Sequence, residues 1–193
     1  MGQIRAAQQA GMLSVRELAA ACAATKLPFA FGLAIMQKES SWTVDGVHLP
    51  GGLNIYGHDP GGACYVPPPA VRYVTEENFT REFRPAVDAG GKSNGVGLFQ
   101  ITYRGYFPLA DAAGLKLWVP ADNALFGVGI LARGFARQRA AGKSVRDAFW
   151  ETARAYNGGS DPTKGTAYAD DALAKARAWL QVVGNTDAPH ITL

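Results

Sequence analysis

The chain is poor in residues that bind metals or form disulfides, with two cysteines and three histidines among 193 residues. Cys22 and Cys64 match no metal-binding spacing, and the histidines are scattered without ligand spacing. The sequence therefore predicts neither a metal site nor a cofactor. The two cysteines could form one disulfide or remain buried thiols, and both alternatives are open at this stage.

A strong excess of charge of one sign is also missing. Lys and Arg number 19 against 16 Asp and Glu, which leaves a net charge of +3. This charge is too small to indicate a nucleic-acid partner, and basic residues do not cluster among aromatic ones. A weakly positive protein would still suit an anionic polymer such as a cell wall.

Long uninterrupted hydrophobic runs are absent too. The most apolar stretch extends from Leu18 to Met36, but Lys26 and Pro28 divide it into halves too short to span a bilayer. The first residues, MGQIRAAQQAG, lack the apolar segment of a secretory signal, so we expect no signal peptide. Hydrophobic residues make up 48% and charged residues 18%, which is the composition of a folded globular domain.

Helical patterns fill most of the chain, and no repeat or linker divides it. We therefore expect one domain over residues 1–193, with its core at about 14–184. Ser14 and Glu17 form a capping-box pattern at the first predicted helix. The helices are expected at about 14–26, 28–42, 75–89, 120–141, 144–157 and 166–183. Between them, Gly-Gly, Pro-Gly-Gly and Pro-Pro-Pro sequences at 43–75 predict a long irregular insertion or a small hairpin.

Glu39 lies at the end of the apolar run PFAFGLAIMQKESSW. At about 100° per residue, Phe31, Ile35 and Glu39 fall along one stripe of a helix. Burial disfavours the charged form of a carboxyl group, so Glu39 is expected to keep its proton near neutral pH. A general acid requires such a proton. The alternative is a solvated Glu at a frayed helix end.

Three stretches, MQKESSW, NGVGLFQIT and ARAYNGG, occur in this order along the chain. Together they resemble the Glu-Ser, Gly-Leu-Met-Gln and Tyr-Asn-x-Gly signatures of lytic transglycosylases and goose-type lysozymes. The resemblance extends from Pro28 to Trp179. It implies a mainly α, lysozyme-like α+β fold. It also implies a muramidase that cleaves the β-1,4 bond between N-acetylmuramic acid and N-acetylglucosamine in peptidoglycan.

The same resemblance implies roles for single residues, with Glu39 as the catalytic acid and base. The candidate substrate-binding residues are Ser40, Phe99, Gln100, Tyr156 and Asn157. In the family the Tyr hydroxyl approaches the catalytic carboxyl. Local roles compete with three of these assignments. Ser40 could cap a helix end, Gln100 could bind its own neighbours, and Asn157 could only end a helix.

The insertion is a departure from many members of the family. Its Tyr56, His58, Asp59 and Tyr65 could form one wall of a cleft, or the insertion could only cover the core. Asp59 is the candidate second carboxylate of a hydrolytic lysozyme. A transglycosylase needs one acid and releases a 1,6-anhydro sugar, and the motifs favour this reaction. Ser93, close to the second motif, is a doubtful contact for an N-acetyl group.

Two further classes stay open: a chitinase-type glycosidase and a non-catalytic glycan-binding or tail module. A cell-wall substrate without a signal peptide predicts a phage endolysin or a virion-associated lysin that acts as a monomer. A bacterial enzyme trimmed of its leader is the alternative source.

Overall fold

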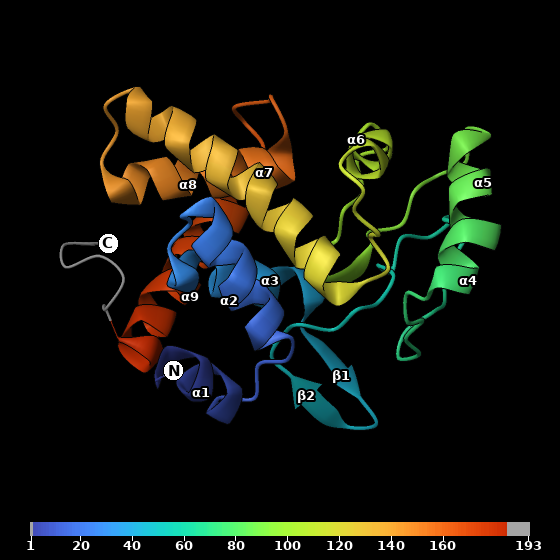
Figure 1. Ribbon diagram of the computed structural model, residues 1–193, viewed down its shortest axis with the longest axis horizontal. Helices are drawn as coiled ribbons and strands as arrows, with labels where there is room; N and C mark the ends of the chain where they lie inside the picture. Colours follow the sequence, from blue (N-terminus) through green and yellow to red (C-terminus); the bar gives the residue numbers. More distant parts are fainter. Residues whose placement is uncertain (1, 185–193) are drawn as a thin grey trace.

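The computed structural model describes residues 2–184 and is mainly helical (Figure 1). The remaining positions of the predicted domain lie outside the described residues. The helices are α1 (Gly2–Gln9), α2 (Val15–Thr25), α3 (Phe29–Ser40), α4 (Glu76–Asn78), α5 (Arg84–Asp88), α6 (Tyr106–Ala112), α7 (Pro120–Ala140), α8 (Val145–Gly158) and α9 (Thr166–Val183). A π-helical turn, Phe79–Phe83, joins α4 to α5, and a 3-10 turn covers Gly97–Phe99. Strands β1 (Trp42–Val44) and β2 (Val47–Leu49) pair as an antiparallel hairpin. The predicted mainly helical fold with a small hairpin is confirmed.

Local capping chemistry explains several helix boundaries. The Ser144 hydroxyl accepts the Asp147 N–H at 3.0 Å, and Thr75 and Asn78 cap each other at the start of α4. Gly184 ends α9 as predicted. These signals depend on residues a few positions apart, which is why the sequence alone locates them. The short helices α1 and α6 were not predicted from the sequence.

The capping box predicted at Ser14 is wrong. Ser14 has a φ of 48°, and its hydroxyl donates to the Gly52 carbonyl at 2.9 Å and makes no cap hydrogen bond. A tertiary contact between α2 and the insertion therefore replaces the local cap. Helix α2 still forms, because Leu18, Ala21 and Cys22 pack into the core.

Helix α3 is the centre of the helical core. All residues from Phe29 to Met36 are buried, because α2 and α9 pack against this helix and α8 reaches it through an aromatic contact. The Phe31 ring stacks on Phe149 of α8, with ring centroids 4.0 Å apart. Figure 1 shows α2, α7, α8 and α9 gathered around α3. A helix that is apolar on all sides is expected to be enclosed in this way.

The insertion is fixed in place by turns and bridges. Asp45 and Gly46, both with positive φ, make the tight turn between β1 and β2. Three isolated bridges attach the remainder, pairing Ile55 with Tyr73, Tyr56 with Val96 and Gly62 with Lys92. Its far end leads into α4 and α5, which lie at the edge of the molecule opposite α8 and α9 (Figure 1).

A second aromatic cluster lies beneath α4 and α5, and it includes a residue of the insertion. Tyr56 is buried against Phe83, and its hydroxyl donates to Asn78 Oδ1 at 3.0 Å. The prediction that Tyr56 lines a cleft wall is therefore wrong, since its ring belongs to the core. Cys22 and Cys64 are buried as thiols. Within residues 2–184, no helix combines the length and apolarity needed to cross a bilayer.

Candidate active site

Glu39 occupies the last turn of α3, where α9 covers it. The Tyr168 hydroxyl, from the first turn of α9, donates a hydrogen bond to Glu39 Oε1. Glu39 lies beyond the fully buried part of α3 and is half-buried as a residue, but its carboxyl group is largely removed from water. Its burial therefore has two causes: it lies at the end of an enclosed helix, and α9 covers it. The single apolar stripe predicted from the sequence is only part of the apolar surface, because α3 is apolar on all sides.

Two neighbouring side chains hold α3 and α9 in register at this point. Trp179 Nε1 donates to Gln37 Oε1 at 2.9 Å, and Lys38 Nζ pairs with Asp171 at 2.5 Å. Three consecutive residues of α3 thus each bind a different residue of α9. The catalytic candidate is consequently positioned by a helix-to-helix interface, which is stiffer than a loop.

Burial raises the pKa of Glu39 from its ordinary 4.5 to about 7. The hydrogen bond from Tyr168 and the positive charge of Lys38 lower this pKa, but by less than burial raises it. Burial, followed by the charge of Glu39, raises the pKa of the Tyr168 hydroxyl well above its usual range, so Tyr168 remains a donor. Near neutral pH the carboxyl can both give and take a proton.

Tyr156, the residue predicted to approach the carboxyl, lies within electrostatic reach of it and is not its direct partner. Its hydroxyl donates to the Phe99 carbonyl at 2.5 Å. Burial raises the Tyr156 pKa well above its usual range, and the charge of Glu39 adds to this effect. The direct hydrogen bond comes from Tyr168, which the motifs did not indicate. The sequence did contain a signal for this contact. Tyr168 lies among the small buried residues of α9, and a buried tyrosine hydroxyl needs a hydrogen-bond partner.

The Gly97–Gln100 turn is built around the Gln100 side chain. Its Nε2 donates to the carbonyls of Ile55 at 3.1 Å and Gly97 at 2.9 Å. Its Oε1 lies so close to Gly57 and Gly95 that a Cβ on either glycine would come within 2.5 Å of it. Gln100 therefore ties the insertion to the turn through its amide, which is the local role weighed above.

Ser40 and Phe99 are turned into the protein. The Ser40 hydroxyl donates to the Met36 carbonyl and accepts the Gly52 N–H, both at 2.9 Å, and Ser40 is fully buried. Phe99 is equally buried. The sugar contacts predicted for these two residues do not fit their positions, because a buried side chain does not reach a ligand. Asn157 is exposed near the end of α8.

Asn123 is a further residue of the site that the sequence did not reveal. It is fully buried in the first turn of α7, where its Oδ1 accepts the Phe99 N–H at 3.2 Å. Its Nδ2 donates to the carbonyls of Val96 at 3.0 Å and Leu117 at 3.1 Å. This one amide therefore binds the backbone just before and within the Gly97–Gln100 turn, and joins it to Leu117 in the segment before α7.

Asp59 supports the other side of the same turn. Its Oδ2 accepts the Gly95 N–H at 2.9 Å. The preceding His58 stacks on Trp42, with ring centroids 4.0 Å apart, and its Nδ1 lies 2.9 Å from the Val66 carbonyl. Both residues thus fasten the insertion, and Ser93 bonds only locally, to the carbonyl of Asn94.

Across residues 2–184, no three His, Cys, Asp or Glu side chains are grouped so that they could hold an ion. Around Glu39, the Tyr168 hydroxyl donates directly to the carboxyl, and the Tyr156 hydroxyl lies within electrostatic reach of it.

Comparisons of the chain with family models, with curated proteins and with solved structures gave no match.

Proposed function

We propose that the protein is a peptidoglycan-cleaving muramidase of lysozyme-like fold that acts as a lytic transglycosylase. The observation that carries the proposal is the Glu39 carboxyl, whose pKa burial raises to about 7 at the end of an enclosed helix. The three motifs that resemble those of lytic transglycosylases support it, because the 97–99 turn contacts α3 and binds Tyr156, whose hydroxyl is within electrostatic reach of this carboxyl. The proposed substrate is the glycan strand, and the proposed setting is a phage endolysin or virion lysin.

In the proposed reaction, protonated Glu39 donates its proton to the glycosidic oxygen as the bond to the muramic C1 breaks. The N-acetylglucosamine part of the chain leaves with that proton as a hydroxyl group. The carboxylate then takes the proton of the muramic 6-hydroxyl, whose oxygen attacks C1 and closes the 1,6-anhydro ring. The Tyr168 hydroxyl, which donates to the carboxyl, stabilises the ionised form between the two steps.

The rate of wall cleavage should fall on the alkaline side of about pH 7. The first step needs the protonated carboxyl, and the protonated fraction decreases as pH rises through the Glu39 pKa of about 7. The measurement is the initial rate of turbidity loss of purified walls from pH 4 to 9. An alkaline limb close to the ordinary Glu pKa of 4.5 would mean a solvated carboxyl and contradict the assignment.

Asp59→Asn should retain most of the activity and leave the product unchanged. An Asn oxygen can accept the Gly95 N–H as the Asp oxygen does, so the turn is kept. The measurement is the mass of the sugars released from purified wall, where 1,6-anhydro ends are expected. A hydrolysed reducing end, together with a folded but inactive Asp59→Asn, would instead define a two-carboxylate lysozyme.

Substrate choice separates the remaining classes. The proposed enzyme releases sugars from peptidoglycan and not from chitin, whereas a chitinase-type glycosidase would do the reverse. A protein that binds walls and releases no sugar from either polymer would be the non-catalytic module.

A further inference from the structure

Tyr103 is an aromatic residue with an unusually open ring. It follows the Gly97–Gln100 turn by three positions, and 66% of its surface is exposed. The ring lies over Gly105, where an added Cβ would come within 2.5 Å of a ring carbon. It also meets the Tyr106 ring edge-on, at a centroid distance of 5.1 Å and an angle of 84°. The ring is thus seated on a glycine and a second tyrosine, and most of its surface faces solvent.

The short segment that carries Tyr103 is fastened on both sides. The Thr102 hydroxyl donates to the Gln100 carbonyl at 2.9 Å, and the Arg104 guanidinium donates to the Val87 carbonyl in α5. The Tyr106 N–H closes a turn on the Tyr103 carbonyl at 2.8 Å. An exposed ring on a fastened segment loses little conformational freedom when a ligand covers it.

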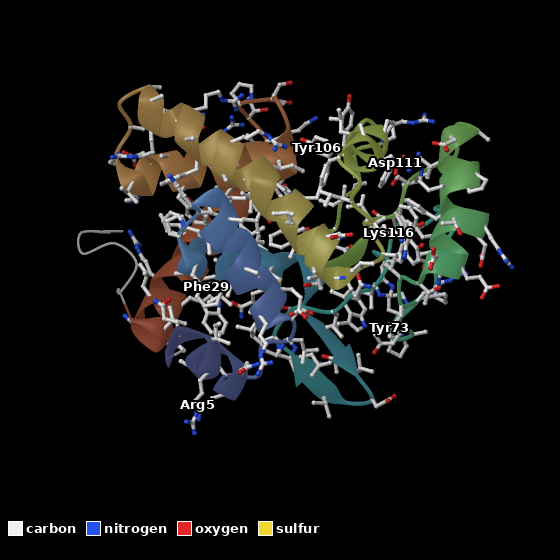
Figure 2. All side chains as sticks on the ribbon, in the orientation of Figure 1. Arg5, Phe29, Tyr73, Tyr106, Asp111 and Lys116 are labelled. Atoms are coloured by element: carbon white, nitrogen blue, oxygen red, sulfur yellow. The ribbon has the colours of Figure 1, made fainter. Side chains whose placement is uncertain are left out.

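A line of contacts connects this ring to the candidate acid. Two rings pack against neighbouring residues of α7. The Tyr106 ring contacts the Phe126 ring at a centroid distance of 5.8 Å, and the Phe99 ring lies against Gly127. The Tyr156 hydroxyl binds the Phe99 carbonyl. Figure 2 shows Tyr106 between α6 and α7.

Tyr156 supplies the last link in this line. Burial and the charges of Glu39 and Tyr106 together raise the pKa of its hydroxyl, so both groups lie within electrostatic reach of Tyr156. Tyr103 is therefore connected to the surroundings of Glu39 through Tyr106, helix α7, Phe99 and Tyr156.

We propose that the open face of Tyr103 is a binding subsite for a hexosamine ring of the glycan strand, at a position removed from the bond that Glu39 cleaves. The proposal rests on the proposed muramidase function and adds a residue that sets how the polymer is held. The C–H face of a pyranose is apolar, and a tyrosine ring offers a rigid apolar surface with a polar rim. A polymer substrate needs binding energy away from the reacting bond, because this energy positions the bond at the acid.

Binding to insoluble peptidoglycan, measured apart from cleavage, tests the subsite. Proteins that carry Glu39→Gln are co-sedimented with purified wall, alone and in combination with Tyr103→Ala or Tyr103→Phe. We expect Tyr103→Ala to weaken binding about tenfold, the effect of losing one aromatic contact together with its buried area. Tyr103→Phe keeps the ring and should bind as Glu39→Gln alone does.

Tyr73→Ala is the matched control, since Tyr73 is also an exposed tyrosine, at 51%, and lies well apart from Tyr106 (Figure 2). It should leave wall binding unchanged. Equal binding by Tyr103→Ala and the control would overturn the subsite. In the otherwise wild-type protein, Tyr103→Ala should lower kcat/KM on glycan fragments and keep the alkaline limb set by Glu39. This penalty should shrink as the fragments are shortened, whereas a penalty independent of length would also overturn the subsite.

The two proposals fail in different measurements. A wild-type protein that releases no sugar from peptidoglycan contradicts the muramidase function, whatever the binding assay gives. Sugar release by the wild type, with wall binding independent of the Tyr103 ring, contradicts the subsite alone.

Discussion

Glu39→Gln is expected to lower the rate of peptidoglycan cleavage by a factor of about 10² to 10⁴, the usual contribution of general acid–base catalysis. The amide keeps the size of the carboxyl and can still accept the Tyr168 hydrogen bond, but it has no acidic proton to give. Sugar release from purified wall measures the effect. A folded variant that cleaves walls at nearly the wild-type rate would remove Glu39 from the mechanism.

The same substitution should change the free energy of unfolding in a pH-dependent way. In the unfolded chain Glu39 titrates near 4.5, and in the folded protein near 7. Between these values the unfolded state releases a proton that the folded state keeps, so wild-type stability falls as pH rises and levels off above 7. The Glu39→Gln variant does not titrate at this position, so its free energy of unfolding does not fall with pH for this reason. Relative to wild type, Glu39→Gln should gain up to about 3 kcal/mol between pH 4 and pH 8 in urea denaturation. A constant difference between the two proteins would contradict the burial of the carboxyl.

Asn123→Ala is expected to lower the free energy of unfolding by about 3 to 5 kcal/mol. The amide makes three hydrogen bonds to buried backbone groups, two at the Gly97–Gln100 turn and one at Leu117. Removing it leaves those groups unsatisfied, at about 1 to 3 kcal/mol for each, less what water recovers in the space left. Urea denaturation at neutral pH measures the loss.

Asn157→Ala provides the matched comparison for stability. Asn157 is an exposed asparagine near the end of α8, and its replacement should change the free energy of unfolding by no more than about 0.5 kcal/mol. If Asn123→Ala were equally mild, the turn would be held by its other contacts, and the role given to the Asn123 amide would be wrong.

The features that the sequence predicted correctly are those encoded within a few residues. Ser144 and Thr75 cap their helices through neighbours three positions away, and Gly184 ends α9 by its own backbone conformation. Such signals need no knowledge of the rest of the chain.

The features that could not be predicted from the sequence depend on partners far away in the chain. Ser14 gives up its cap for the Gly52 carbonyl, 38 positions on, and Tyr168 meets Glu39 across 129 positions. Tyr56 lies in a Gly- and Pro-rich segment, where an aromatic residue is expected at the surface. In the structure, α4 and the π-helical turn enclose its ring. Periodicity reports which face of an element is apolar, and it does not report what covers that face.

The attachment of α3 to α9 has a consequence for the order of events during translation. Glu39 is synthesised early, whereas Tyr168, Asp171 and Trp179 emerge from the ribosome only with the last described helix. Until that helix docks, the end of α3 has water in place of α9, and a solvated carboxyl titrates near its ordinary value. A nascent or truncated chain that ends before α9 therefore carries the acid without the environment that tunes it. Docking of α9 is thus the step that raises the Glu39 pKa.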